Sequence, residues 1–301
     1  MEMARTQAVA AGPRRHMGLT RREGLMGWLL VSPWVLGFVV FTLGPMIASV
    51  YFSFTEYRLI QPPKWIGVAN YQRMFTDDLF YKSLTVTSIY TLVGVPLGIC
   101  AALFVAVLLN QKISGARFVR TIFYLPSVVS GVAVSMVFGW ILNHKFGMLN
   151  YALRFVGISG PDWLGNPRWT LWAFVLMSLW GIGGNMIILL AGLQGVPVSL
   201  HEAAEIDGAS SWRRFWAITM PTISPAILFV SIMSIIGSWQ VFTQAFIMTG
   251  GGPANATLFY MLYLYRNAFT WFEMGYASAL AWVLFVIALR TSRNLVHYEG
   301  A

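Results

Sequence analysis

Charged residues are scarce in this sequence, and their scarcity limits the class of protein. Only 10% of the 301 residues are charged, 57% are hydrophobic, and thirteen are tryptophan. Soluble domains carry about 25% charged residues, so the composition excludes a soluble globular protein and is typical of a polytopic membrane protein. We therefore interpret the net charge of +9 as a determinant of membrane topology rather than of nucleic-acid binding.

Cysteine is almost absent, and the usual catalytic motifs are missing. Cys100 is the only cysteine and lies in an apolar run, so the chain has no disulfide framework and no cysteine metal site. The four histidines do not form an HExxH motif, and no serine lies in Gly-x-Ser-x-Gly. These absences argue against a metal site and against a soluble-type hydrolase. An intramembrane lipid-modifying enzyme stays open as an alternative.

Acids and lysines are missing from the apolar runs, although ion-coupled transporters usually need ionisable groups near the midplane. The chain also lacks a phosphate-binding Gly-x-x-x-x-Gly-Lys loop, because none of its four lysines follows a glycine. A carrier or channel that works alone remains an alternative. If ATP drives the protein, another chain must bind the ATP and Mg²⁺.

Six apolar runs predict an all-α protein with about six transmembrane helices. We expect residues 1–24 to form a cytoplasmic tail and residues 25–301 to form the membrane domain. Pro33 and Pro45 predict broken-helix points in the first run, and Gly94, Pro96 and Gly98 predict an interruption of the second run. Pro126 lies inside the third run. The runs are Leu25–Phe54, Ser83–Leu109, Phe118–Leu142, Trp169–Leu193, Thr222–Met248 and Gly275–Leu289.

The sixth run is short. From Gly275 to Leu289 it would extend only about 22 Å, less than the hydrocarbon core of about 30 Å. Either the span begins near Trp271 and Arg290 reaches back to the interface, or this helix is shorter than the others.

Basic residues indicate the orientation. With a cytoplasmic amino terminus, the inner segments contain twelve of the twenty Lys and Arg residues, which agrees with the positive-inside rule. These twelve are Arg5, Arg14, Arg15, Arg21, Arg22, Lys112, Arg117, Arg120, Arg213, Arg214, Arg290 and Arg293.

One polar stretch, residues 202–225, separates the fourth and fifth runs and predicts a helix, a turn and a second helix. Glu202 and Glu205 are expected in the first turn of the first helix, where the helix dipole favours negative charge, and Asp207 stands before the turn glycine. Gly208 is expected to adopt a positive φ and to reverse the chain. The second helix has an apolar side made of Trp212, Phe215, Trp216 and Ile218.

This stretch resembles the EAA signature of permease subunits of binding-protein-dependent ABC importers. The matching residues are Glu202, Ala203, Ala204, Asp207, Gly208, Ala209, Phe215, Ile218, Pro221 and Pro225. Further segments are similar to the MalF-like subunits of the carbohydrate-uptake branch. They are Asn70-Tyr71 with Phe75 and Asp77, Leu108 to Asn110, Arg120 with Phe123 and Leu125-Pro126, Ala191 to Gln194, and Met248 to Pro253.

The resemblance implies the type I ABC importer transmembrane fold in the cell (inner) membrane of a bacterium or archaeon. It implies four kinds of partner: a second homologous permease subunit, two ATPase subunits, an extracytoplasmic sugar-binding protein and membrane lipid. The chain would hold no cofactor and would not be an enzyme, since the ATPase subunits bind ATP and Mg²⁺. The first helix of the hairpin would dock in a groove of the ATPase, and the solute would be a sugar or related polyol.

Polar and aromatic residues in the fourth and fifth runs are candidates for the solute path, because sugars are held by hydrogen bonds and ring stacking. The same side chains would also fit a packing role, since buried amides and glycines bring helices together. The candidates are Trp180, Gly181, Gly184, Asn185, Trp239, Gln240 and Gln244.

Overall fold

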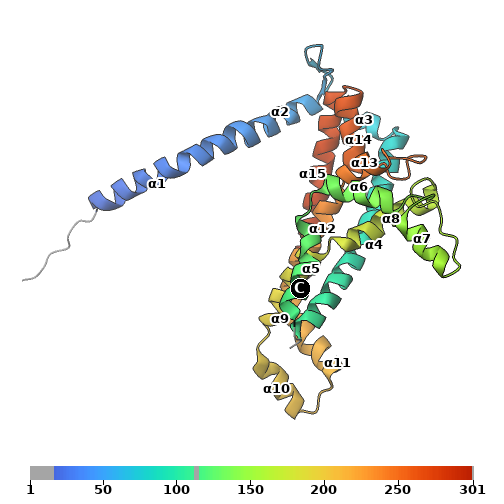
Figure 1. Ribbon diagram of the computed structural model, residues 1–301. Coiled ribbons are helices and arrows are strands. Elements are labelled where there is room, and N and C mark those ends of the chain that lie inside the picture. Colours follow the sequence, from blue (N-terminus) through green and yellow to red (C-terminus); the bar gives the residue numbers. More distant parts are fainter. Residues whose placement is uncertain (1–16, 112–114, 300–301) are drawn as a thin grey trace, which may run out of the picture. The chain divides into compact units, whose positions relative to one another are not determined.

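The computed structural model describes residues 17–111 and 115–299, and within these ranges the regular structure is helical apart from one two-stranded pairing (Figure 1). The two strands, β1 (Thr55–Glu56) and β2 (Lys64–Trp65), are antiparallel. The all-α prediction is therefore confirmed. Some residues of the predictions lie outside the described part, namely Arg5, Arg14, Arg15, His16, Lys112 and the side chains of Arg21, Arg22 and His297.

The chain divides into two compact units, residues 1–51 and residues 52–301. The first apolar run is α1 (Met17–Phe38), a π-helical turn η1 (Val39–Leu43) and α2 (Gly44–Ser53). Pro33 lies inside α1 without breaking it, contrary to the prediction. Near Pro45 the turn widens, because the Gly44 N–H bonds to the Val39 carbonyl five residues back and Pro45 has no N–H of its own.

The second run is one continuous helix, α4 (Asp78–Asn110), preceded by the short helix α3 (Ala69–Met74). The predicted interruption at Gly94, Pro96 and Gly98 is wrong. A proline removes one N–H from the hydrogen-bond ladder, and in a packed bundle this loss does not end the helix.

The third and fourth runs are each bent pairs of helices. In the third, α5 (Ala116–Val128) and α6 (Gly131–Ile141) meet at 98°, and the break falls just after Pro126. In the fourth, α8 (Pro167–Trp180) and α9 (Gly183–Gln194) meet at 49°. A short helix, α7 (Met148–Phe155), lies in the loop between the two pairs.

The second helix of the polar stretch continues without a break into the helix of the fifth run. After α10 (Val198–Ile206), the segment Ser211–Met248 contains α11 (Ser211–Arg214), the π-helical turn η2 (Phe215–Thr219), α12 (Met220–Trp239) and α13 (Thr243–Met248). It is followed by α14 (Tyr260–Tyr265) and the π-helical turn η3 (Arg266–Thr270).

The sixth run is longer than its apolar core suggests. Helix α15 (Met274–Glu299) has 26 residues, about 39 Å at 1.5 Å per residue, so its length suffices to cross. The predicted start at Trp271 is wrong, because Phe272 adopts a φ of +56° and separates Trp271 from the helix. The extra length comes from the other end, since the helix continues past Arg290 and Arg293.

By length and composition, the described residues contain four helices able to cross a membrane, or up to six if each bent pair is one span. This range agrees with the six predicted spans.

Two apolar cores are stacked along the bundle of residues 52–301. The distal core lies away from the polar hairpin and includes Tyr90, Phe174, Trp239, Tyr260 and Leu280. The proximal core lies nearer the hairpin and includes Ala102, Ala106, Met186, Leu189, Ile223 and Val230. Helices α4 and α12 each contribute to both cores, whereas α8 contributes to the distal core and α9 to the proximal core.

Gly183 permits a close approach of two backbones at the start of α9. A Cβ at this position would lie 2.1 Å from the Phe123 carbonyl oxygen of α5, whereas a Cβ at the neighbouring Gly184 would meet no atom within 4 Å. The contact between α5 and α9 therefore requires glycine at residue 183.

We predict that Gly183→Ala lowers the stability of the protein by about 1–3 kcal/mol, because α9 must move away from α5. The expected result is a lower midpoint of thermal aggregation of the purified, detergent-solubilised protein. Gly184→Ala is the matched control and should keep the parental midpoint. Equal midpoints for the two variants would contradict the assigned contact.

Candidate functional site

The polar hairpin projects from one end of the bundle (Figure 1). Its first helix, α10, begins at Val198 because Pro197 precedes it with a φ that suits a helix start. Neither Glu202 nor Glu205 occupies its first turn, so that prediction is wrong. Glu202 lies in the second turn, and Glu205 and Asp207 lie at the carboxyl end, where the helix dipole does not favour them.

The turn has the predicted conformation at Gly208, whose φ is +76°. Two hydrogen bonds close it: the Gly208 N–H bonds to the Glu205 carbonyl at 3.0 Å, and the Ala209 N–H bonds to the Ala204 carbonyl at 2.9 Å. This pair of bonds is the Schellman pattern, which satisfies the last carbonyls of a helix. Gly208 and its neighbours thus fix the direction in which the chain leaves α10.

An ion pair joins the two helices of the hairpin. The Arg214 guanidinium donates to the Glu205 carboxylate at 2.6 Å and also to the Ser211 hydroxyl at 3.3 Å. The Ser210 hydroxyl caps α11 by accepting the Arg213 N–H at 3.3 Å. Arg214 is four-fifths buried, so this pair is screened less than a fully exposed one. The pair was not predicted from the sequence.

The outer surface of α10 presents an acid and an aliphatic side chain to the surroundings. Glu202 is exposed and, among the described residues, has no ion-pair or hydrogen-bond partner for its side chain. Ile206, directly before the turn, is 88% exposed. Sequence reasoning missed Ile206, although a large aliphatic residue beside a turn glycine in a polar stretch was a usable signal.

The second helix of the hairpin runs directly into the bundle. Ile218 packs against the proximal core, and Phe215 stacks on Trp212 with ring centroids 6.4 Å apart. The turn η2 lies just before Pro221, where the Met220 N–H bonds to the Phe215 carbonyl. The elements α11, η2 and α12 are contiguous, so the second helix of the hairpin continues directly into α12.

A cavity of about 190 Å³, lined by apolar residues, glycines and a few polar side chains, lies between the two cores. Predicted residues Gly181 and Asn185 line it, and the Asn185 amide donates to the Ser234 hydroxyl at 3.1 Å. Nearby, Thr91 and Ser238 share a hydrogen bond of 2.7 Å. Glycines and serines keep this layer open where larger side chains would fill it. The other lining residues are Tyr90, Gly94, Val95, Gly98, Ser178, Ile182, Ser234, Gly237, Ser238 and Val241.

The remaining predicted path residues do not line the cavity. Trp180 packs edge-on against Phe138, and Trp239 is buried in the distal core. Gly184 and Gln244 are half-buried, and Gln240 is exposed just after α12.

Sequence reasoning missed the two serines of α12 that line the cavity, Ser234 and Ser238. The signal was available, because Ser231, Ser234 and Ser238 recur at the spacing of one helical face in an otherwise apolar run.

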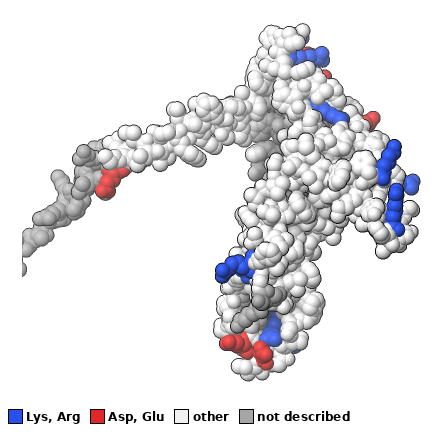
Figure 2. Space-filling view, in the orientation of Figure 1, with Lys and Arg blue, Asp and Glu red and all other residues white. Residues whose placement is uncertain are grey.

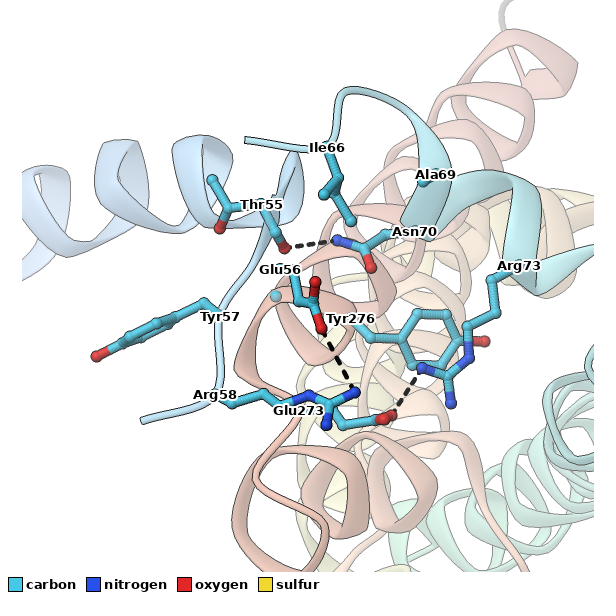
Figure 3. Close-up of a pocket in the computed structure, with 11 residues that line it drawn as sticks. Thr55, Glu56, Tyr57, Arg58, Ile66, Ala69, Asn70, Arg73, Glu273 and Tyr276 are labelled. Carbon is cyan, nitrogen blue, oxygen red and sulfur yellow. Dashed lines mark hydrogen bonds and ion pairs between the residues drawn. The ribbon is translucent and has the colours of Figure 1, made fainter. Parts of the chain in front are cut away.

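At the other end of the bundle a pocket of about 200 Å³ lies between the β1 segment, α3 and the start of α15 (Figure 3). The Asn70 amide donates to the Ser53 and Thr55 carbonyls at 2.9 Å. Arg73 pairs with Glu273 at 2.8 Å and lies over the Tyr276 ring. The two contacts of Arg73 join segments about 200 residues apart in the sequence.

Asp77 stabilises the same end. One carboxylate oxygen caps α4 by accepting the Leu79 and Phe80 N–H groups, and the other accepts hydrogen bonds from the Tyr263 and Tyr276 hydroxyls. Burial raises the pKa of the Asp77 carboxyl, but these hydrogen bonds outweigh burial and hold the pKa below its usual value. Asn70 and Asp77, two residues of the sequence resemblance, therefore have structural contacts here.

Comparison with known proteins identifies the family. Residues 94–298 match the family described as "Binding-protein-dependent transport system inner membrane component". The chain is 45% identical to a probable ABC transporter permease, YesP, of Bacillus subtilis, over 93% of this chain and 94% of that one. It is 32% identical to the trehalose/maltose transport system permease MalF of Thermococcus litoralis, over 90% and 92% respectively.

Solved structures agree. A bacterial ABC transporter that imports alginate has a chain with a TM-score of 0.82 at 24% identity, covering 95% of this chain and 98% of that one. A second structure, of a bacterial alginate ABC transporter with an oligosaccharide-bound periplasmic protein, has a TM-score of 0.78 at 26% identity, covering 95% and 96%. The chain matches a family of permeases that neither hydrolyse ATP nor hold a cofactor of their own. This match agrees with the EAA resemblance of residues 202–225. This chain belongs to the multi-pass permease subunits of binding-protein-dependent ABC importers for sugars and oligosaccharides.

Proposed function

We propose that this permease pairs with a second, homologous permease and with two ATPase subunits, and that residues 202–225 couple it to one of those ATPases. The observation that carries this proposal is the geometry of the hairpin: a helix closed by a Schellman turn, held by the Glu205–Arg214 pair, and continued into a spanning helix. The ATPases would bind ATP and Mg²⁺, and a periplasmic protein would deliver the solute.

In this arrangement α10 enters a groove of the ATPase. Ile206 supplies an apolar contact at the tip, since its side chain is exposed. Glu202 meets a basic group of the groove, since its carboxylate has no ion-pair partner within the described part of this chain. Ala203 and Ala204 keep the helix narrow. Because Phe215, Ile218 and Pro221 lie on the helix that continues as α12, closure of the ATPase would move α12 relative to α9.

We propose that the cavity between the two cores is part of the solute path. Hydroxyl and amide groups from four helices (α4, α8, α9 and α12) converge there, and a sugar offers hydroxyls that both donate and accept hydrogen bonds. Gly181 and Asn185 belong to this cavity. Roles in the path for Trp180, Gly184, Trp239, Gln240 and Gln244 stay predictions, and the second permease would have to complete the path around them.

We further propose that the amino terminus is cytoplasmic, so that the hairpin faces the ATPases and the Asn70–Asp77 end faces the binding protein. The basic residues of the short inner segments support this orientation. The membrane would be the cell (inner) membrane of a bacterium or archaeon.

The coupling role predicts different outcomes for two substitutions at Gly208. Gly208→Val should strain the turn by about 1–3 kcal/mol, because a β-branched residue disfavours a φ of +76°. Gly208→Asn is the matched control, since asparagine tolerates this conformation and no neighbouring atom crowds the position. We expect binding-protein-stimulated ATP hydrolysis by the assembled complex to be lost in the valine variant and kept in the asparagine variant.

Glu202→Lys should lower the same stimulated hydrolysis through charge repulsion, with the permease still present in the membrane. Full stimulation in both Gly208→Val and Glu202→Lys would rule out the coupling role.

The solute-path proposal predicts that Asn185→Leu lowers sugar uptake and changes the preference among sugars, because a hydrogen-bonding group in the cavity is lost. Gln240→Leu should have a smaller effect, since Gln240 lies outside the cavity. Ile187→Leu, an exposed position on the same helix as Asn185, is the control. Unchanged rates and preferences in vesicles with Asn185→Leu would mean that this side chain is structural.

The orientation predicts the accessibility of new cysteines in a chain with Cys100→Ser. A thiol reagent that cannot enter the cell should label Ile60→Cys, which is 98% exposed in an outer loop, and should fail to label Ser292→Cys near the end of α15. Permeabilised cells should show labelling at both. Equal labelling in intact cells would mean that α15 does not cross or that the orientation is reversed.

A further inference from the structure

Helix α7, in the loop between the third and fourth runs, exposes an apolar stripe that neither the bundle nor the proposed transport role uses. Met148, Tyr151 and Phe155 recur at i, i+3 and i+7, and they are 67%, 63% and 76% exposed. Val156, directly after the helix, is 72% exposed. Isolated exposed apolar residues are ordinary, but a continuous stripe of this kind marks an interaction surface.

The stripe is held by a well-ordered loop. Asn150, on the opposite side of α7, is 3% exposed and donates to the His144 and Pro161 carbonyls, each at 3.2 Å. The Trp163 indole N–H donates in return to the Asn150 side-chain oxygen at 2.7 Å. These bonds tie both ends of the loop to α7. The polar groups of Asn150, on the side of α7 that faces the loop, are therefore all hydrogen-bonded, and the exposed stripe is directed away from the loop.

Basic residues flank the stripe without balancing acids. Lys145, Arg154 and Arg168 are exposed, and Asp162 is the only acid of residues 143–168. Asp162 is engaged within the loop, since its carboxylate accepts the Gly165 N–H at 2.9 Å. Figure 2 shows blue side chains gathered on the lobe that carries α7 in Figure 1.

The next helix supports a position at the membrane surface. Helix α8 exposes Trp169, Trp172 and Leu176, which recur along one helical face and are each almost half exposed. Tryptophan and tyrosine are enriched where a membrane protein meets the headgroup layer. The stripe of α7 and the aromatic start of α8 are close in sequence, so both fit a position at the boundary between the headgroup layer and the acyl chains.

We propose that α7 lies in the headgroup layer of the outer leaflet, with its stripe against the acyl chains, and that Lys145, Arg154 and Arg168 bind the phosphates of anionic phospholipids. A helix with an apolar face and a basic flank binds such a surface through both contributions. Anionic phosphates also account for three bases on the outer side, where the positive-inside rule disfavours them. A lipid surface fits this combination better than a protein groove, which would need its own acids.

The test uses the assembled transporter in nanodiscs. A bimane probe is attached to Val156→Cys in a Cys100→Ser background, and the nanodiscs contain phosphatidylcholine with 20% phosphatidylglycerol, a composition that we choose as about one anionic lipid in five. Bromine is placed on the acyl chains of one lipid or of the other. We expect quenching by both, with a ratio of phosphatidylglycerol to phosphatidylcholine near the probe about fivefold above the bulk ratio, the factor given by one base near an anionic surface.

Two controls separate the contributions. Lys145→Gln, Arg154→Gln and Arg168→Gln together should remove the excess of phosphatidylglycerol and leave quenching by brominated phosphatidylcholine. A probe at Ile60→Cys, 98% exposed in another loop, should be quenched by aqueous iodide and not by brominated lipid.

Three results would overturn the proposal. Quenching of the Val156 probe by iodide alone would place the stripe in water. Quenching by neither iodide nor lipid would mean that a protein, such as a partner subunit or the binding protein, covers it. Equal quenching by the two lipids, after correction for their mole fractions, would mean that the stripe contacts acyl chains but that the bases do not bind anionic headgroups.

Discussion

The transmembrane bundle depends on an alternation of side-chain size along its helices. Helix α4 packs Val86 and Tyr90 in the distal core, carries Gly94 and Gly98 at the level of the cavity, and packs Ala102 and Ala106 in the proximal core. The α8–α9 pair and α12 follow the same sequence of apolar, small and apolar residues. Two rigid layers are thus joined by a layer with little packing, and the polar groups of that layer are paired with one another.

This arrangement explains why the bend between α8 and α9 lies where it does. The break follows Trp180 and includes Gly181, a residue that lines the cavity, so the change of direction falls in the loosely packed layer rather than in either core. A bend inside a core would cost packing on both sides of the helix. A motion of one core relative to the other about this layer therefore breaks fewer packing contacts than a motion within either core.

The six spans predicted from the sequence lie within the range of four to six, and the hairpin and the positive φ of Gly208 are as predicted, because composition and glycine stereochemistry act locally. The sequence did not predict the continuity of α4 through Pro96, since the bundle outweighs a local helix breaker. It also ended the sixth span too early: hydropathy falls at Arg290, but hydrogen bonding continues the helix through residues that are no longer apolar. Of the cavity residues, the sequence predicted Asn185, which stands out as an amide in an apolar run. It did not predict the serines of α12, because their role depends on the packing of α12 against α9, where Ser234 accepts the hydrogen bond of Asn185.

The π-helical turn before Pro221 has a consequence for the long helix from Ser211 to Trp239. One extra residue within a turn rotates everything that follows by about 100° relative to a regular α-helix. In a regular helix Ile223 and Val230 would lie within about 20° of Trp212, and the extra residue turns these two residues of the proximal core about 80–100° away from it. The two ends of one continuous helix thereby present independently oriented faces, and the hairpin and the bundle need not share a single hydrophobic stripe.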